Sequence, residues 1–239
     1  MASRRTLRKN LLLMKLPTKA LLFDLDGTLV NNMMVHHRAW QRKLKELGLD
    51  YSLERVKAEI HGVNLEILQG LFGDRYTMDE YKQIAWDKEA AYREIFAADF
   101  AANIVPGALD FIRQAYAVGI PMAIGTAGPK ENAEFVVENL GIGDLMGHLV
   151  HSGMVSKGKP DPEVFQQGAD VLGVDLTDCI IFEDSVTGAK AANNAGCPVV
   201  VLTTTHHPPE FAGLEVADFR PDFRGLRVER TADGFELML

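Results

Sequence analysis

Cysteine, long hydrophobic runs and an excess of positive charge are all scarce or missing in this 239-residue chain. Two cysteines, Cys179 and Cys197, are too few for the disulfide framework of a small secreted domain. No uninterrupted apolar stretch approaches the roughly 18 residues that mark a membrane-spanning helix. Asp and Glu number 33 against 25 Lys and Arg, and the net charge of −8 disfavours general binding to nucleic acid. We therefore expect a cytoplasmic protein with buried thiols and with neither a nucleic-acid nor a membrane partner.

The N-terminus differs from this acidic average. Four basic side chains lie among the first nine residues, ahead of a short apolar run at 11–14. Lys15 ends that run and no small-residue cleavage site follows, so we do not expect a secretory signal. We predict a basic, flexible tail over 1–18, ahead of the first strand.

Continuous apolar runs predict strands that are buried on both faces, as the strands of a parallel sheet are. A helical pattern lies near each run, and this alternation is typical of an α/β fold with an open, doubly wound (Rossmann-like) parallel sheet. We predict strands at 20–23, 120–124, 179–182 and 198–202, and helices at 106–118, 129–140, 161–173 and 185–195. The core domain would comprise 19–32 and 104–239. Asp233-Gly234 separates alternating runs at 226–230 and 235–237 and predicts a C-terminal edge β-hairpin.

Residues 33–103 interrupt the alternation, because they contain helical patterns and no strand-like run. Thr77 and Glu80 have the spacing of a capping box at the start of the longest of these helices. We interpret this range as an inserted helical cap. Its predicted helices are 33–47, 52–60, 64–71 and 77–97.

Polar side chains follow three of the predicted strands. Asp24 and Asp26 follow the first, Thr126 the second, and Glu183-Asp184 the third. The carboxyl ends of parallel strands meet at one edge of a sheet, where ligands of such folds bind. For single residues a structural role stays open: the Asp-Gly at 26–27 is also a turn dipeptide, and Asp184 or its neighbour could cap the next helix. Together they predict one acidic site.

Phosphoryl transfer is the chemistry that this edge predicts. Asp24 can attack phosphorus and form an aspartyl-phosphate, while Asp26 can protonate the leaving oxygen and later deprotonate water. Clustered carboxylates need a hard cation to approach phosphate, and we predict Mg²⁺. An EF-hand calcium loop is not matched, because Gly27 stands fourth rather than sixth. Thr126 offers a hydroxyl to phosphate oxygens, and Lys159 can neutralise the phosphate and the nucleophile.

Four ordered motifs resemble those of the haloacid dehalogenase (HAD) superfamily. They are Phe23-Asp24-Leu25-Asp26-Gly27-Thr28-Leu29, Thr126, Lys159-Pro160-Asp161-Pro162 and Phe182-Glu183-Asp184-Ser185-Val186-Thr187-Gly188. The resemblance extends over about 19–220. The helical insertion looks like the cap of the β-phosphoglucomutase-like phosphatase branch.

The resemblance implies a role for each matching residue. Asp24 would be the nucleophile and Asp26 the acid and base, while Thr126 and Lys159 would hold the phosphoryl group. The implied Mg²⁺ ligands are Asp24, Asp26 through its carbonyl and Asp184, with Glu183 in or near the shell. In the cap the resemblance implies a histidine of the first helix (His36), a substrate-specificity loop (His61 and Gly62) and a lysine that faces the site (Lys88). Phosphate would also meet the backbone of Ala127, which follows Thr126.

The chain departs from the family's pattern at three places. Asn31-Asn32 stands where the family often has Asp-Ser, and either Asn could cap the next helix. Ala127-Gly128-Pro129 follows Thr126, so phosphate would rely more on backbone N–H groups. Leu65 stands where sugar-phosphate mutases of this branch carry an arginine.

We expect a Mg²⁺-dependent phosphatase that hydrolyses a small phosphorylated metabolite, such as a sugar phosphate, through an aspartyl-phosphate. A β-phosphoglucomutase-type isomerase is the nearest alternative. Leu65 weakens it, because leucine lacks the guanidinium that would grip a second phosphate. A non-catalytic protein that binds a phosphorylated metabolite is the alternative from another class. We expect a monomer or a weak homodimer.

Overall fold

A six-stranded parallel sheet forms the centre of the computed structural model, which describes residues 14–239. The four basic residues among the first nine therefore lie outside the described residues. The strand order is β4-β3-β2-β5-β6-β7. The strands are β2 (Ala20–Phe23), β3 (Met122–Gly125), β4 (His148–Val150), β5 (Cys179–Glu183), β6 (Val199–Leu202) and β7 (Asp218–Arg220). The predicted α/β fold class is confirmed, and β4 and β7 extend the sheet at its two edges.

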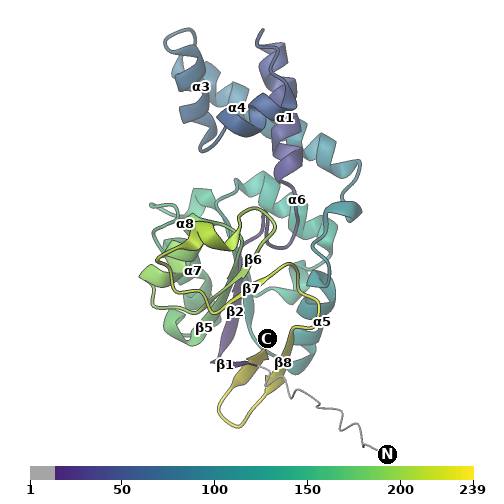
Figure 1. Cartoon of the computed structure of the whole chain (residues 1–239), viewed down its shortest axis with the longest axis vertical. Coiled ribbons are helices and arrows are strands. Elements are labelled where there is room, and N and C mark those ends of the chain that lie inside the picture. Colours follow the sequence, from purple (N-terminus) through teal and green to yellow (C-terminus); the bar gives the residue numbers. More distant parts are fainter. Residues whose placement is uncertain (1–13) are drawn as a thin grey trace, which may run out of the picture.

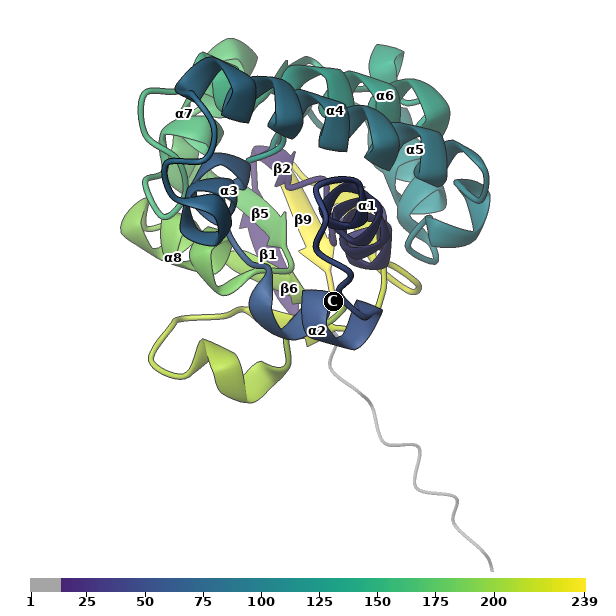
Figure 2. The same ribbon diagram turned by 90° about the horizontal axis from the view of Figure 1, so that it is seen from above.

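Helices cover both faces of this sheet, because its central strands are apolar on both sides. α5 (Ala108–Val118) and α6 (Lys130–Leu140) pack on one face, and α7 (Glu163–Leu172) and α8 (Val186–Asn194) on the other (Figure 2). On the first face the rings of Phe23 and Phe182 stack at 5.0 Å between neighbouring strands. Asp24 and Glu183, which directly follow these two residues, are therefore attached to a rigid, buried part of the core.

The inserted segment 33–103, which we call the cap segment, lies beyond one end of the sheet (Figure 1). Its helices are α1 (Met33–Glu46), α2 (Leu53–Glu59), α3 (Asn64–Phe72) and α4 (Met78–Ala97). They enclose an apolar cluster of their own around Trp40, Leu68 and Tyr81. Thr77 and Glu80 form the predicted capping box of α4.

Two adjacent linkers join the cap segment to the sheet. Asn31 N donates to Asn103 O at 2.7 Å, and Val105 N donates to Leu29 O at 3.0 Å. The chain therefore enters and leaves the cap segment side by side. Such a paired connection is a natural place for a hinge.

A second, antiparallel sheet holds the C-terminus in the order β1-β9-β8. Its strands are β1 (Lys15–Thr18), β8 (Arg227–Arg230) and β9 (Phe235–Met238). The predicted C-terminal hairpin is confirmed as β8 and β9, and it belongs to this separate sheet rather than to the six-stranded one. The tail predicted over 1–18 is wrong at 15–18, because β1 pairs with β9 and Lys15 forms an ion pair with Glu236 at 2.9 Å. Gln114 of α5 exchanges two hydrogen bonds with the backbone of Val228 and fastens this sheet to the core.

Over 14–239, no helix combines the length and the apolar character that a membrane crossing requires. Cys179 and Cys197 are free and buried, as predicted. Burial raises the pKa of each thiol to about 12. Both side chains are therefore protonated at neutral pH.

Candidate active site

The register of β2 on β5 brings two carboxylates together. Phe23 pairs with Phe182, and Asp24 N donates to Phe182 O at 2.9 Å, so Asp24 and Glu183 leave neighbouring strands at the same level. Asp184 follows directly, and all three carboxylate residues are buried. One oxygen from each lies within 4.8 Å of the others. Three of the five strand-end residues that the sequence predicted to converge thus form a compact cluster.

Two glycines make room for this cluster. A Cβ atom at Gly27 would overlap the Asp184 carboxylate, and a Cβ atom at Gly188 would overlap the Glu183 carboxylate. Gly27 also has a φ of +87°, which disfavours any residue with a side chain. The glycines of the first and fourth motifs are therefore required by the close approach of the carboxylates.

Lys159 lies between two of the carboxylates. Its ammonium donates to Asp24 Oδ1 at 2.5 Å and to Glu183 Oε1 at 2.7 Å, and it lies 4.6 Å from the centre of the Phe165 ring. Burial acts to lower the pKa of Lys159, but the charges of Asp24 and Glu183 outweigh burial and raise it above its ordinary value. Lys159 is therefore positively charged where it contacts these oxygens.

Glu183 also orders the start of α8. Its Oε2 accepts hydrogen bonds from Asp184 N at 2.8 Å, from Ser185 N at 2.8 Å and from Ser185 Oγ at 2.9 Å. Ser185 caps α8, since its Oγ accepts from Gly188 N at 3.0 Å. The capping role that the sequence left open for Asp184 or its neighbour thus belongs to Ser185.

Negative charge exceeds positive charge in this cluster. Burial, together with the charge of Glu183, raises the pKa of Asp24 to about 7, against the opposing charge of Lys159. Burial also raises the pKa of Asp184, with Glu183 and Asp24 adding to the effect. One ammonium faces three buried carboxylates, and oxygen atoms of this kind are the ligands that hard divalent cations prefer. The residues therefore fit a divalent metal ion.

Asp26 lies beside the cluster, and the side-chain amide of Asn32 links it to Tyr92 of the cap segment. Asn32 Nδ2 donates to Asp26 Oδ1 and, at 2.6 Å, to the hydroxyl oxygen of Tyr92. Asn32 occupies the N-cap position of α1, but its side chain makes no capping hydrogen bond, so the capping role that we considered for it is wrong. Burial raises the pKa of Asp26, against the hydrogen bond from Asn32. A raised pKa favours the protonated form that a general acid requires.

Thr126 follows β3 and is buried. Its Oγ1 accepts from Gly128 N at 3.0 Å, and its own N–H donates to Val150 O at 3.0 Å. The loop backbone therefore fixes the hydroxyl. Ala127 is exposed between these two loop residues.

The lysine that the resemblance implied in the cap segment, Lys88, is buried. Lys88 Nζ lies 2.8 Å from Glu89 Oε1 and 3.2 Å from His36 Nδ1. The His36 ring stacks on Tyr92 at 4.0 Å between centroids. Burial, with the charge of Lys88, lowers the pKa of His36 to about 3, so this imidazole is neutral and its Nδ1 accepts the hydrogen bond.

His61 and Gly62 contrast with Lys88 and His36. Both are exposed, at the end of α2. The His61 imidazole lies 3.1 Å from Ala58 O, so its polar contact is with its own helix rather than with the carboxylates. Gly62 has a φ of +100° and provides the turn into α3.

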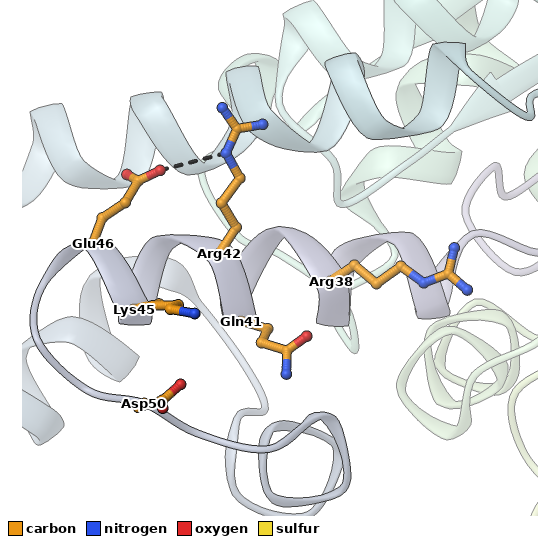
Figure 3. Close-up of a pocket in the computed structure, with 6 residues that line it drawn as sticks. All are labelled: Arg38, Gln41, Arg42, Lys45, Glu46 and Asp50. Atoms are coloured by element: carbon orange, nitrogen blue, oxygen red, sulfur yellow. Dashed lines mark hydrogen bonds and ion pairs between the residues drawn. The ribbon is translucent and has the colours of Figure 1, made fainter.

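A separate pocket of about 490 Å³ lies along α1 (Figure 3). Arg42 forms ion pairs there with Glu46 at 3.4 Å and with Glu94 of α4 at 3.0 Å. The charged groups thus pair across exposed helix surfaces, and none of the lining residues belongs to the predicted site. The pocket is lined by Arg38, Gln41, Arg42, Lys45, Glu46 and Asp50.

Known proteins are similar to this chain in sequence and in fold. A family model for haloacid dehalogenase-like hydrolases matches residues 18–196. A validoxylamine A 7'-phosphate phosphatase from Streptomyces hygroscopicus subsp. limoneus is 32% identical over 201 residues, which cover 83% of this chain and 92% of that protein. Hexitol phosphatase A from Escherichia coli K12 is 31% identical over 202 residues, with coverages of 83% and 89%. The structure of a β-phosphoglucomutase from Clostridium difficile matches with a TM-score of 0.67 at 25% identity, covering 77% of this chain and 84% of that one.

Proposed function

We propose, from the premise that this chain belongs to the haloacid dehalogenase-like hydrolases, that it is a Mg²⁺-dependent phosphatase acting on a sugar phosphate or a similar small monophosphate. The buried cluster of Asp24, Glu183 and Asp184 beside Lys159 carries the proposal. The relatives named validoxylamine A 7'-phosphate phosphatase and hexitol phosphatase A support the substrate class. Residues 33–103 would form the cap domain over a core of 19–32 and 104–239.

The proposed Mg²⁺ ligands are Asp24, Asp184 and the carbonyl of Asp26. When bound, the ion would neutralise phosphate oxygens and the nucleophile. Glu183 uses one oxygen for Lys159 and the other for the start of α8. We therefore assign Glu183 to the edge of the metal site, where it holds Lys159 against Asp24.

The reaction would proceed in two displacements at phosphorus. A carboxylate oxygen of Asp24 forms a bond to phosphorus while the ester P–O bond breaks, and Asp26 gives its proton to the leaving oxygen. Asp26 then removes a proton from water, whose oxygen attacks the aspartyl-phosphate. The bond between phosphorus and Asp24 breaks and inorganic phosphate leaves. Lys159, Thr126 and the backbone at Ala127 would bind the phosphoryl oxygens.

Hydrolysis is favoured over isomerisation by the cap segment. Leu65 packs against the apolar cluster there and offers no hydrogen bond to a second phosphate. Arg75, ten residues after Leu65, lies over the rings of Tyr76 and Phe72, at 5.3 and 5.7 Å. A mutase must keep hold of a bisphosphate while the intermediate reorients, and a bidentate guanidinium is suited to that task.

A screen of phosphorylated sugars and polyols for phosphate release tests the proposal. We expect release that requires Mg²⁺ and stops in excess chelator. No release from any ester, or full turnover in chelator, would contradict it. Incubation with β-glucose 1-phosphate and catalytic bisphosphate distinguishes the alternative. Formation of glucose 6-phosphate that outruns phosphate release by orders of magnitude would identify a mutase.

The proposed setting is the cytoplasm, supported by two free and buried cysteines. The proposed assembly is a monomer or a weak homodimer. Size-exclusion chromatography with light scattering over a range of protein concentrations would test the assembly.

A further inference from the structure

A buried polar bridge joins the cap segment to the core. Asn132 Nδ2, from the first turn of α6, donates to Glu89 Oε2 of α4 at 2.6 Å, and Arg93 donates to Asn132 Oδ1 at 2.7 Å. Asn132 is 2% exposed and Glu89 is 8% exposed. Asn132 follows Thr126 by six residues, so the bridge meets the core close to the proposed phosphate loop.

The other oxygen of Glu89 organises the cap segment. Glu89 Oε1 accepts from Lys88 Nζ at 2.8 Å and from Asn64 Nδ2, at the start of α3, at 2.6 Å. Burial acts to raise the pKa of Glu89, but the charge of Lys88, with the hydrogen bonds from Lys88 and Asn64, outweighs it and lowers the pKa to about 2. Glu89 is therefore a carboxylate with both oxygens engaged, one toward the cap segment and one toward the core.

The path from Glu89 continues to the proposed acid. Lys88 Nζ contacts His36 Nδ1 at 3.2 Å, and His36 stacks on Tyr92. The Tyr92 hydroxyl accepts from Asn32, which also donates to Asp26. Along this path, two hydrogen bonds join the cap segment to α6. Asn132 forms both of them, one with Glu89 and one with Arg93.

We propose that Asn132 is a positioning residue for the hydrolysis proposed above: through Glu89 it seats α4 against the core, so that Tyr92 and Asn32 align Asp26 with the leaving oxygen. The inference rests on that proposed function. If α4 lifted from α6, the hydrogen bonds of Asn132 to Glu89 and Arg93 would break, while the contact between Lys88 and Glu89, both on α4, would stay intact. Asn132 therefore links cap closure to the alignment of the acid.

Asn132→Asp is the most direct variant, because it keeps the size of the side chain and places a second carboxylate against Glu89. Asn139→Asp is the matched control, since Asn139 is exposed on the same helix and the change in net charge is the same. Glu89→Gln combined with Asn132→Asp is the rescue. The amide nitrogen introduced on α4 would donate to the carboxylate introduced on α6, while the amide oxygen would still accept from Lys88 and Asn64.

Two readouts are needed. The first is kcat/KM for the best sugar phosphate of the screen and for p-nitrophenyl phosphate, whose leaving group needs little acid assistance. The second is the distance between spin labels at the exposed positions Asp79→Cys of the cap segment and Glu138→Cys of α6, which does not depend on turnover. Cys179 and Cys197 are buried, so labelling is directed to the introduced cysteines.

For Asn132→Asp we expect a loss of about tenfold to hundredfold on the sugar phosphate, as for breaking a hydrogen bond to a charged group. The loss on p-nitrophenyl phosphate should be smaller, the label distance should lengthen, and the double variant should recover most of both. An unchanged label distance, equal losses on both esters, or no recovery in the double variant would overturn the inference. If the wild type hydrolyses neither ester, the proposed function fails, and the label distance still tests the bridge.

Discussion

The carboxylate edge of the sheet and the polar face of α4 both bury charged side chains, but they are built in different ways. At the sheet edge, strand register places Asp24 beside Glu183, and the backbone fixes each within one residue of a buried apolar run. On α4, Lys88 and Glu89 depend on partners from α1, α3 and α6. The proposed catalytic chemistry thus lies in a site formed with the sheet, whereas the proposed alignment of Asp26 depends on how the cap segment docks.

Asp24→Asn should cause the largest loss of turnover, because it changes the sheet-edge site itself. An amide is a poor nucleophile toward phosphorus, so turnover should fall by at least about 10⁴-fold, as when other covalent catalysts lose their nucleophilic unit. Phosphate release from the best substrate of the screen is the measurement. Asp170→Asn, at an exposed position of α7, is the control and should keep full activity. Comparable turnover in the two variants would remove Asp24 from the nucleophilic role.

Asp26→Ala should show an effect that depends on the leaving group. General acid catalysis contributes about 10²–10⁴-fold, so hydrolysis of an alkyl phosphate should fall by about that factor. Formation of the phosphoenzyme from p-nitrophenyl phosphate should fall much less, because its leaving group needs little protonation. Burst-phase kinetics with both esters measure the difference. Equal losses would exclude Asp26 as the acid.

Replacing glycine by alanine should change the free energy of unfolding in opposite directions at two helical positions. Gly188→Ala in α8 introduces a Cβ that overlaps Glu183 and should destabilise the core by about 1–3 kcal/mol. Gly70→Ala in α3 meets no neighbouring atom within 4 Å and should stabilise the cap segment by about 0.5–1 kcal/mol. Denaturant unfolding measures both. Destabilisation of similar size at the two positions would contradict the difference in packing.

Tyr92→Phe should have the smallest effect. It removes the hydroxyl that accepts from Asn32 and keeps the ring that stacks on His36, so kcat should fall a few-fold, in line with about 0.5–1.5 kcal/mol for one hydrogen bond. Tyr81→Phe is the matched control, because its hydroxyl donates to Gly73 O inside the cap segment, at 2.7 Å. The same fall in kcat for both variants would place the effect in cap stability rather than in alignment of Asp26.

The residues at the sheet edge were predictable because each stands directly after, or in a short motif near, a buried apolar run. A strand of continuous hydrophobicity ends where the chain reaches the sheet edge, so Asp24, Thr126 and Glu183 could be placed there from sequence alone. Lys159 was found by its motif, and the structure shows why an ammonium stands there, between Asp24 and Glu183.

The bridge was not predictable, because its partners are 43 residues apart on two different helices. Helical periodicity tells which face of α4 is apolar, but it does not tell that Glu89 meets Asn132 once the cap segment docks. Strands β4 and β7 were missed because each has only three residues. Strand β1 contains Pro17 and shows no clear alternation, and its pairing depends on β9 at the far end of the chain.

Chemical trapping of the phosphorylated enzyme tests the central claim most directly. Borohydride reduces an acyl phosphate of aspartate to homoserine, so peptide mapping after a quench during turnover identifies the residue that carried phosphorus. We expect homoserine at position 24, formed only when both Mg²⁺ and substrate are present, and absent from Asp24→Asn. Homoserine at another position, or steady turnover with position 24 unmodified in every sample, would contradict it.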